Sequence, residues 1–380
     1  MSYIVSPTFK NDVLNITRGA IPTADDDSID SSLNSWNKFY KLLQEHTLPG
    51  KIFSRDVAIT YPVVSGGNGN YRGGVLDFDD NIHFIPSNEV LGQKITKTGI
   101  ITTYSLVPYN ETRYAGGVVS TSGDIHFIPE GSYYSHLRGL KLSPSGIAST
   151  YSIINSTQMN LAYFGGVMSP KGDIHFIPVN ASVGQKINKN GTVSTYSLPY
   201  TGFPYGGGVL DPAGNIHLMP KYIGTSNKGV KMSPSGSFST YPLVYAGFFG
   251  GVLNSIGEIH LVPSQSGYGQ KINLDGTTSY YPLVYSSTNN SYYGGVLAPN
   301  GDIHFIPYNA PVGQKVSVDG IVSTYSLAYT TTAAYMGGVV DAEGNIHFIP
   351  YYAEVGQKIL TNSVKPFPES IRHSPFYNKL

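Results

Sequence analysis

One five-residue pattern, Ile-His-(Phe/Leu)-(Ile/Met/Val)-Pro, occurs seven times along the chain. Its histidines recur with a period of about 43 residues, the length of one four-stranded blade of a β-propeller. They are His83, His126, His175, His217, His260, His304 and His347. A helical repeat of this length would need apolar residues spaced by three and four, which the units lack. The period therefore predicts an all-β protein, a seven-bladed β-propeller.

Each repeat contains four short segments rich in β-branched and aromatic residues, as strands are. In one repeat these segments lie at 292–297, 302–307, 313–316 and 322–327. The first two flank Pro299-Asn300-Gly301, where proline and glycine favour a tight turn. The 44 glycines, 25 prolines and 30 tyrosines of the chain fit many short strands joined by such turns. We therefore expect four strands in every blade.

The repeats are permuted relative to the chain ends. Seven Thr/Ser-Tyr segments occur, but the first, around Tyr61, precedes the first Gly-Gly pair, and none follows Lys358. Residues 57–64 are therefore predicted to supply the outer strand of the last blade, which closes the ring and leaves only short edges exposed. The recurring Gly-Gly-Val segments are placed next to the central channel, because residues without side chains let inner strands crowd together.

The repeats divide the chain into three parts. Residues 50–360 form the predicted propeller, between an N-terminal arm at 1–49 and a C-terminal arm at 361–380. Ser31–His46 has the apolar spacing of an amphipathic helix, with Trp36 on its aromatic side. This side must be buried, either on the propeller or on another chain, and the sequence leaves both open. The remaining arm residues are expected to be extended segments that order against a partner.

The combination Gly-Gly-Val-Leu-x-x-x-Gly-(Asn/Asp)-Ile-His-x-x-Pro resembles the kelch-like "GGVL-PNG...IHFIP" seven-bladed β-propeller repeat proteins of phage, algal and protist type. The resemblance covers residues 50–360. It implies a fold and not an activity, because one fold can carry many functions.

Composition argues against several classes of partner. The 24 basic and 24 acidic residues cancel, so no overall field favours nucleic acid or an anionic membrane. The chain has no cysteine, no run of about 18 apolar residues and no signal-peptide pattern at its start. We therefore expect a soluble chain without membrane insertion.

The repeated polar residues have structural and functional interpretations. We expect no metal and no cofactor, because histidines on seven separate blades cannot converge on one ion. The histidines are predicted to be structural, each bonded on the inter-blade face to a neighbouring backbone or hydroxyl group. Lysines recur as well and are expected at solvated blade edges, with a cationic ring as the alternative. They are Lys94, Lys141, Lys186, Lys231, Lys271, Lys315 and Lys358.

An aromatic residue stands two places before Gly-Gly in every repeat. We expect these rings to pack at the start of the inner strands, while a platform for sugar or protein stays open as the alternative. Together with Trp36 they are the candidate partner or glycan contacts. They are Tyr71, Tyr114, Tyr163, Tyr205, Phe248, Tyr292 and Tyr335.

No catalytic motif of a familiar kind appears, so no catalytic residue is predicted. The leading hypothesis is a non-enzymatic structural or adhesive propeller of a larger assembly, specifically a virion component of the phage tail, capsid-associated or fibre kind. Its partners would be other protein subunits, reached through the N-terminal helix and the arms, with cell-surface glycan as a further possibility. The alternatives are a carbohydrate-binding lectin and an enzyme with its site at the channel mouth.

Overall fold

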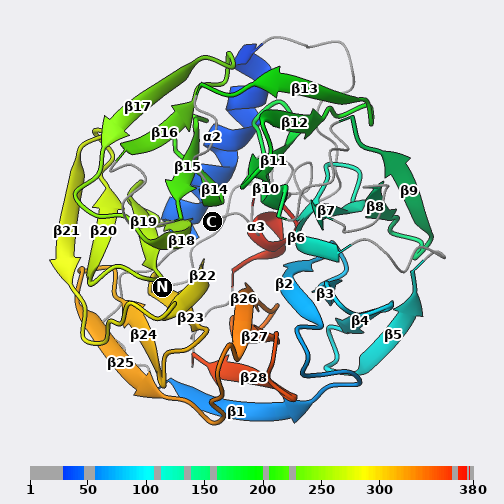
Figure 1. Ribbon diagram of the computed structural model, residues 1–380, viewed down its shortest axis with the longest axis vertical. Coiled ribbons are helices and arrows are strands. Elements are labelled where there is room, and N and C mark those ends of the chain that lie inside the picture. The colour runs from blue at the N-terminus through cyan, green and yellow to red at the C-terminus, as the bar shows by residue number, and fades with distance from the viewer. Residues whose placement is uncertain are drawn as a thin grey trace, which may run out of the picture.

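The computed structural model describes residues 29–46, 56–106, 113–131, 138–154, 161–199, 205–221, 228–361, 367–374 and 376. Within these ranges the strands form seven four-stranded antiparallel sheets arranged around a central axis, as Figure 1 shows. The described residues also form helices α2 (Ile29–His46) and α3 (Glu369–Arg372). The predicted seven-bladed all-β propeller is confirmed.

The strands follow the repeat order within each blade. The inner strands are β2 (Tyr71–Leu76), β6 (Arg113–Val119), β10 (Tyr163–Met168), β14 (Tyr205–Leu210), β18 (Phe248–Leu253), β22 (Tyr292–Leu297) and β26 (Tyr335–Val340). The second strands are β3 (Ile82–Pro86), β7 (Ile125–Gly131), β11 (Ile174–Pro178), β15 (Ile216–Pro220), β19 (Ile259–Pro263), β23 (Ile303–Pro307) and β27 (Ile346–Pro350). The third strands are β4 (Leu91–Ile95), β8 (Arg138–Leu142), β12 (Val183–Ile187), β16 (Lys228–Met232), β20 (Tyr268–Ile272), β24 (Val312–Val316) and β28 (Val355–Leu360). The outer strands are β5 (Ile101–Ser105), β9 (Ala148–Ser152), β13 (Val193–Ser197), β17 (Phe238–Pro242), β21 (Thr278–Pro282), β25 (Val322–Ser326) and β1 (Val57–Pro62). We number the blades 1 to 7 by their inner strands, from β2 to β26.

The ring closes through the first strand of the chain. β1 pairs antiparallel with β28, from Val57 opposite Leu360 to Pro62 opposite Val355, and the sheet order is β1-β28-β27-β26. The prediction that residues 57–64 complete the last blade is therefore confirmed, with the strand ending at Pro62. Figure 1 shows this blue strand lying outside the orange and red strands of the last blade.

The inner strands meet at the axis in a ring of seven glycines. The first glycine of every Gly-Gly pair has a positive φ, between +70° and +156°. A Cβ added to Gly116 would lie 2.8 Å from the Cα of Gly165 in the next blade, and one added to Gly337 would lie 2.9 Å from the Cα of Gly73. Both conditions, an unusual φ and a backbone neighbour, require glycine. We call Gly73, Gly116, Gly165, Gly207, Gly250, Gly294 and Gly337 the glycine ring.

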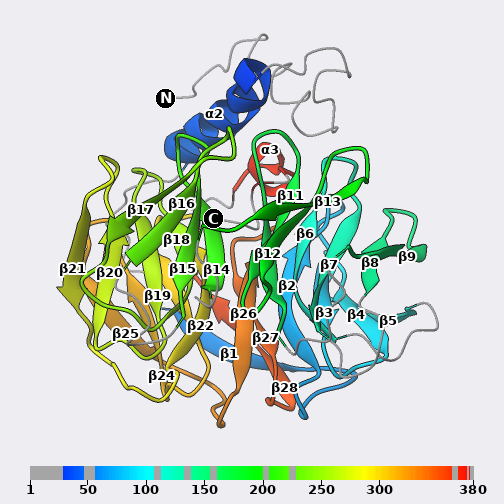
Figure 2. The same cartoon turned by 45° about the horizontal axis from the view of Figure 1, so that its top comes forward.

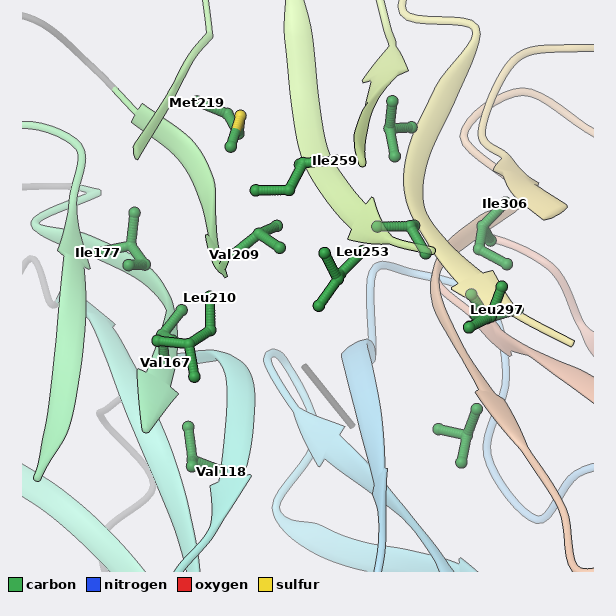
Figure 3. Close-up of a cluster of buried hydrophobic side chains, with 14 of the residues drawn as sticks. Val118, Val167, Ile177, Val209, Leu210, Met219, Leu253, Ile259, Leu297 and Ile306 are labelled. Carbon is green, nitrogen blue, oxygen red and sulfur yellow. The ribbon is translucent and has the colours of Figure 1, made fainter. Parts of the chain in front are cut away.

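Neighbouring blades pack through apolar side chains of their inner two strands. Val167 and Ile177 of blade 3 fill the space beside Gly208 of blade 4, where an added Cβ would lie 2.5 Å from the Ile177 Cδ1 atom. The close-up in Figure 3 shows these side chains between adjacent strands, in a layer that continues through Val209 and Ile259. The second glycine of each pair therefore makes room for the preceding blade.

The two faces of the ring differ. We call the face where the inner strands begin the mouth face, and the face with the turns between first and second strands the turn face. Both helices lie on the turn face, where Figure 2 shows them above the blades. The indole Nε1 of Trp36 donates to the backbone oxygens of Asp211 and Pro212, at 2.9 and 3.1 Å. The Arg372 guanidinium and the His373 ring both bond Asp80, in the turn of blade 1.

The apolar side of α2 therefore packs against the propeller of the same chain. Trp36, Phe39 and Leu43 are almost completely buried, and Phe376 packs its ring edge against Trp36, with centroids 5.1 Å apart. The predicted helix is present, beginning at Ile29 instead of Ser31. Along the described part of the chain, no helix has both the length and the apolar character needed to cross a membrane.

The glycine ring gives a test of the close packing at the axis. We expect Gly116→Ala to lower the free energy of unfolding by about 3 kcal/mol or more, because the new methyl group meets backbone that cannot move aside. The matched control is Gly146→Ala, since Gly146 has a similar φ of +81° but no atom within 4 Å of an added Cβ. Its cost should be the backbone strain alone, about 1 kcal/mol. Urea unfolding of both variants measures the difference, and equal costs would show that crowding is unimportant.

Candidate functional site

The repeated histidines are held inside their own blades. In blade 1, His83 Nδ1 lies 3.1 Å from the Tyr104 hydroxyl, which comes from the outer strand β5. The tyrosine ring reaches the histidine by crossing Gly92 of the third strand, where an added Cβ would be only 2.1 Å from the ring. The same bond occurs in six of the seven blades at 3.0 to 3.3 Å among the described residues. In these six blades the histidine is therefore hydrogen-bonded to a tyrosine hydroxyl of its own blade.

In blade 2 the corresponding pair is not hydrogen-bonded. The rings of His126 and Tyr151 still meet edge to face, with centroids 5.7 Å apart. Both His126 Nδ1 and the Tyr151 hydroxyl are buried without a hydrogen-bond partner in the described part of the chain. Blade 2 is therefore a natural control for the contribution of this bond.

The inner hairpin turns carry one carboxylate at either their first or their fifth position, and never at both. When it is at the first position, as in Asp77, it accepts a hydrogen bond from the histidine Nε2, 3.0 Å away. Burial alone would raise the pKa of Asp77, but the His83 hydrogen bond and charge lower it. When the carboxylate is at the fifth position, as in Asp173, it pairs with the lysine of the third strand, here Lys186 at 2.6 Å.

In blades 5 and 7 one carboxylate serves both partners, because Glu258 contacts His260 and Lys271, and Asp341 contacts His347 and Lys358. Burial lowers the pKa of His126 and of His175 to about 4 in blades where the first turn position is serine. The lysines of blades 2, 3, 5, 6 and 7 are paired with turn carboxylates and do not form a ring around the channel. Within the described ranges, no group of three histidine or acidic side chains could hold a metal ion.

The aromatic residues two places before Gly-Gly lie in the interior. Tyr71, Tyr163, Tyr292 and Phe248 have no exposed surface, and the others are at most 4% exposed. Tyr71 packs its edge on Phe84 of the neighbouring strand. The hypothesis that these rings form a surface platform for glycan or protein is therefore corrected, because a ligand cannot reach buried rings. Trp36, the remaining candidate contact, lies on the side of α2 that faces the propeller and is 1% exposed.

The surface of the mouth face is built from positions that do not repeat. One is the residue immediately before Gly-Gly, and the other is the residue after the proline of the second strand. The first set is Arg72, Ala115, Phe164, Gly206, Phe249, Tyr293 and Met336, and the second is Ser87, Glu130, Val179, Lys221, Ser264, Tyr308 and Tyr351. Taken together, the two residues form a different pair in each blade, so a symmetric frame presents an asymmetric surface.

A pocket of about 160 Å³ opens at the axis on this face. Its floor is the glycine ring, and its walls include Arg72, Phe164, Phe249, Tyr293 and Met336. The walls are mainly apolar, with one guanidinium among aromatic rings. We call this the mouth pocket.

Aromatic rings form a continuous arc around one side of the mouth pocket. Phe164 of blade 3 contacts Phe249 of blade 5 edge to face, with centroids 4.7 Å apart, across Gly206 of blade 4. Phe249 stacks on Tyr293 at 3.9 Å, and Tyr293 stacks on Tyr308 at 4.1 Å. Burial raises the pKa of Tyr308 to about 12, so its hydroxyl stays protonated at neutral pH.

A polar cluster adjoins the mouth pocket through Arg72. Arg72 lies over the ring of Tyr351, 5.1 Å from its centroid, and donates from Nη2 to the Tyr351 hydroxyl at 2.8 Å. Its Nη1 is paired with Glu130, a buried carboxylate of blade 2. The cluster therefore joins blades 1, 2 and 7, and closure of the ring brings blade 7 next to blade 1. Such a combination of an apolar cavity and a few convergent polar groups is typical of small-molecule sites.

The side chains that line the mouth pocket stand one residue after the predicted contact positions, as Arg72 follows Tyr71. The inner strand alternates its side chains, so Tyr71 points into the blade packing while Arg72 points to the channel. The useful signal was the lack of repetition at the two mouth positions within an otherwise regular pattern. The glycine of each third strand, such as Gly92, is needed because the tyrosine of the outer strand crosses over it.

The fold is shared with known propellers of diverse function. A streptogramin B lyase structure matches with a TM-score of 0.69 and 19% identity, covering 80% of this chain and 97% of that one. A catalytically inactive histidine-to-alanine variant of virginiamycin B lyase from Staphylococcus aureus, with quinupristin, matches with a TM-score of 0.69, 16% identity and coverage of 80% and 99%. The WD40 propeller domain of Doa1 matches at 0.62 with 11% identity, covering 82% and 98%. Neither a protein-family model nor a curated protein sequence matches this chain.

These likenesses establish the fold, and they correct the functional hypothesis. We expected a non-enzymatic structural or adhesive component of a virion, but propellers with this architecture include lyases. The prediction of a non-enzymatic virion scaffold is therefore wrong, and nothing in the matches indicates an adhesive or lectin role. The error arose because the repeats lack catalytic motifs, whereas a propeller site is built from positions outside the repeat pattern.

The histidine–tyrosine bond can be tested with a matched pair of variants. We expect Tyr104→Phe to reduce the free energy of unfolding by about 1 to 2 kcal/mol, because it leaves a buried histidine nitrogen without its partner. Tyr151→Phe removes a hydroxyl that has no hydrogen bond in the described residues, so its cost should stay below about 0.5 kcal/mol. Denaturant unfolding measures both, and a larger loss for Tyr151→Phe would contradict this interpretation.

The buried histidines also predict a pH dependence. A histidine whose folded pKa lies below its unfolded value binds fewer protons when folded, so the protein loses stability as the pH falls from about 6.5 towards 4. For His126, with a folded pKa of about 4, this loss should be roughly 1 to 2 kcal/mol at pH 5. His126→Gln should flatten the fall in unfolding midpoint between pH 6.5 and 5. An unchanged slope in that variant would show that His126 does not contribute.

Proposed function

We propose that the protein is an enzyme that binds a small molecule in the mouth pocket and acts on it there. The observation that carries this proposal is the break in symmetry at the mouth, where the pair of side chains differs from blade to blade. Three aromatic rings, those of Phe164, Phe249 and Tyr293, line one axial pocket together with Arg72, which is ion-paired with the buried Glu130. Ligand sites of folded proteins combine these features.

The mouth offers groups suited to a lyase reaction, the reaction class named for two structural neighbours. Elimination breaks a C–H bond, passes the proton to a base, forms a double bond with the released electron pair and expels a leaving group. Glu130 is a buried carboxylate behind the pocket residue Arg72, and its Oε2 atom has no hydrogen-bond partner in the described part of the chain. We assign it the role of base, with Arg72 holding its other oxygen. We assign the Tyr351 hydroxyl, which accepts a hydrogen bond from Arg72, the role of donating its own proton to the leaving group.

Two finer expectations stay predictions. The kelch-like repeat type rests on the recurring Gly-Gly-Val-Leu and Ile-His-x-x-Pro segments. Contacts with other subunits rest on the N-terminal helix and the arms, and most of the arm residues lie outside the described residues. The aromatic side of the N-terminal helix is occupied by the propeller itself.

Quinupristin, the compound present with one neighbour, is the first substrate to test. We expect the purified protein to convert it to a product that liquid chromatography with absorbance detection resolves, because elimination creates a new double bond. Glu130→Gln keeps the shape of the side chain but removes the base, so the rate should fall by about 10² or more.

The matched control is Tyr280→Ala, since Tyr280 is an exposed aromatic residue on the outer strand β21, away from the mouth pocket. Its rate should equal that of the unchanged protein. Absence of any product from quinupristin, or equal rates for Glu130→Gln and Tyr280→Ala, would contradict the proposal.

A further inference from the structure

A second pocket lies on the turn face, in the groove between blades 2 and 3. Its volume is about 350 Å³, and most of its lining residues are polar. Blade 2 contributes the turn around Ser122, the strand residue Lys141 and the outer-strand residues Ser149 and Thr150, and blade 3 contributes the turn 188–191. We call this cavity the groove pocket. It shares no lining residue with the mouth pocket, which opens on the other face of the ring.

The equivalent groove between blades 1 and 2 differs in size and in charge. It holds a pocket of only about 90 Å³. Its charged carboxylate and ammonium groups are those of Asp77, Asp79 and Lys94. The groove pocket has instead one carboxylate and two ammonium groups, those of Asp124, Lys141 and Lys189. Carboxylates therefore outnumber ammonium groups in the first groove, whereas ammonium groups outnumber carboxylates in the second.

The groove pocket also contains a histidine without a hydrogen-bond partner. In blades 1, 4 and 7 an oxygen of the turn aspartate lies 3.0 Å from the Nε2 atom of the repeated histidine. In blade 2 the aspartate position is occupied by Ser120, and neither ring nitrogen of His126 is hydrogen-bonded to a described residue. His126 is 7% exposed and lines the pocket. Because its Nδ1 atom is buried beside Tyr151, Nε2 is the nitrogen that a ligand can reach.

An oxyanion would supply what this histidine lacks. Burial lowers the pKa of His126 to about 4, so the ring is neutral at pH 7 and can donate one N–H group. The positive charge must then come from the lysines. Lys141 is only loosely held, because its distance to Asp124 is 3.3 Å, whereas the equivalent pair of Lys186 and Asp173 is 2.6 Å apart.

We propose that the groove pocket binds a phosphate monoester of a small hydroxylated molecule. The phosphate group lies between Lys141, Lys189 and His126 Nε2, where one of its oxygens takes the place of the turn aspartate of blades 1, 4 and 7. Its three terminal oxygens match these three donors, and lysine is a common phosphate ligand. The hydroxyl groups of Ser149 and Thr150 line the same pocket and bond the hydroxylated part. This site is additional to the proposed enzyme activity and does not depend on it.

The probe is D-ribose 5-phosphate. The matched compounds are D-ribose, which lacks the phosphate, and inorganic phosphate, which lacks the hydroxylated part. We expect isothermal titration of the full chain at low ionic strength to show ribose 5-phosphate binding roughly tenfold or more tightly than either, since hydrogen bonds to a charged group and to hydroxyls both contribute. Equal affinity for ribose, or no binding of ribose 5-phosphate, would overturn the proposal. Equal affinity for inorganic phosphate would contradict the assigned hydroxylated part.

One substitution gives blade 2 the turn aspartate that blades 1, 4 and 7 already have. Ser120→Asp places a carboxylate beside His126 Nε2, where the phosphate oxygen is expected, and like charges repel. It should abolish binding of ribose 5-phosphate. The matched control is Ser169→Asp, which makes the same change in blade 3 at a residue that does not line the groove pocket. Its affinity should equal that of the unchanged protein, and equal affinities of the two variants would contradict the assigned site.

The lysines give a second pair of variants. Lys141→Met removes an ammonium group from the pocket lining, whereas Lys186→Met makes the same change in blade 3 at a residue outside the lining. We expect the first to weaken binding roughly tenfold or more and the second to change it by less than about twofold, because charges outside the pocket are screened. The reverse order of effects would contradict the proposal. Circular dichroism verifies that all four variants are folded.

The ring signals of the histidines locate the bound phosphate. In NMR spectra the signals of His126 are identified by their loss in His126→Gln. They should shift on addition of ribose 5-phosphate, while those of His175 stay in place, because His175 does not line the groove pocket. Binding without a shift at His126 would overturn the assigned contact. Conversion of quinupristin enters none of these measurements, so the phosphate site and the enzyme activity are tested separately.

Discussion

The close approach of seven backbones at the axis is the constraint on which the rest of the structure depends. Adjacent members of the glycine ring come so near that an added Cβ would lie within 3 Å of the next Cα at several points. Only a residue without a side chain, able to adopt a positive φ, satisfies both conditions. The resulting bend in each inner strand sends one residue into the blade packing and the next, as at Tyr71 and Arg72, towards the channel.

The repeated polar residues form hydrogen bonds and ion pairs that hold the blades together. Histidine bonds tyrosine across a glycine, lysine pairs with a turn carboxylate, and Gln93 accepts from the backbone N–H groups of Val64 and Ser65, which connect the last blade to the first. These bonds satisfy groups that would be costly to bury alone. Chemical diversity is therefore concentrated at the mouth positions, such as Arg72 and Phe164.

The fold could be predicted well from the sequence because the same pattern of strands and turns recurs seven times. The period, the Gly-Gly pairs and the displaced segment around Tyr61 together indicated the number of blades and their closure. The site was not predictable in the same way, since Arg72, Glu130 and Tyr351 are far apart in sequence and meet only when the ring is closed. Tyr71 has an equivalent in every blade because it packs inside the blade. Its neighbour Arg72, which does not recur, faces the pocket.

The pairing of β1 with β28 has a consequence for synthesis of the chain. Val57–Pro62 leaves the ribosome before any blade exists, while its partner Val355–Leu360 emerges only after all the other strands. The earliest strand must therefore wait as an unpaired edge while six complete blades assemble beside it. During that interval it is the segment most open to pairing with a strand of another nascent molecule, which would link two chains by exchange of their first strands.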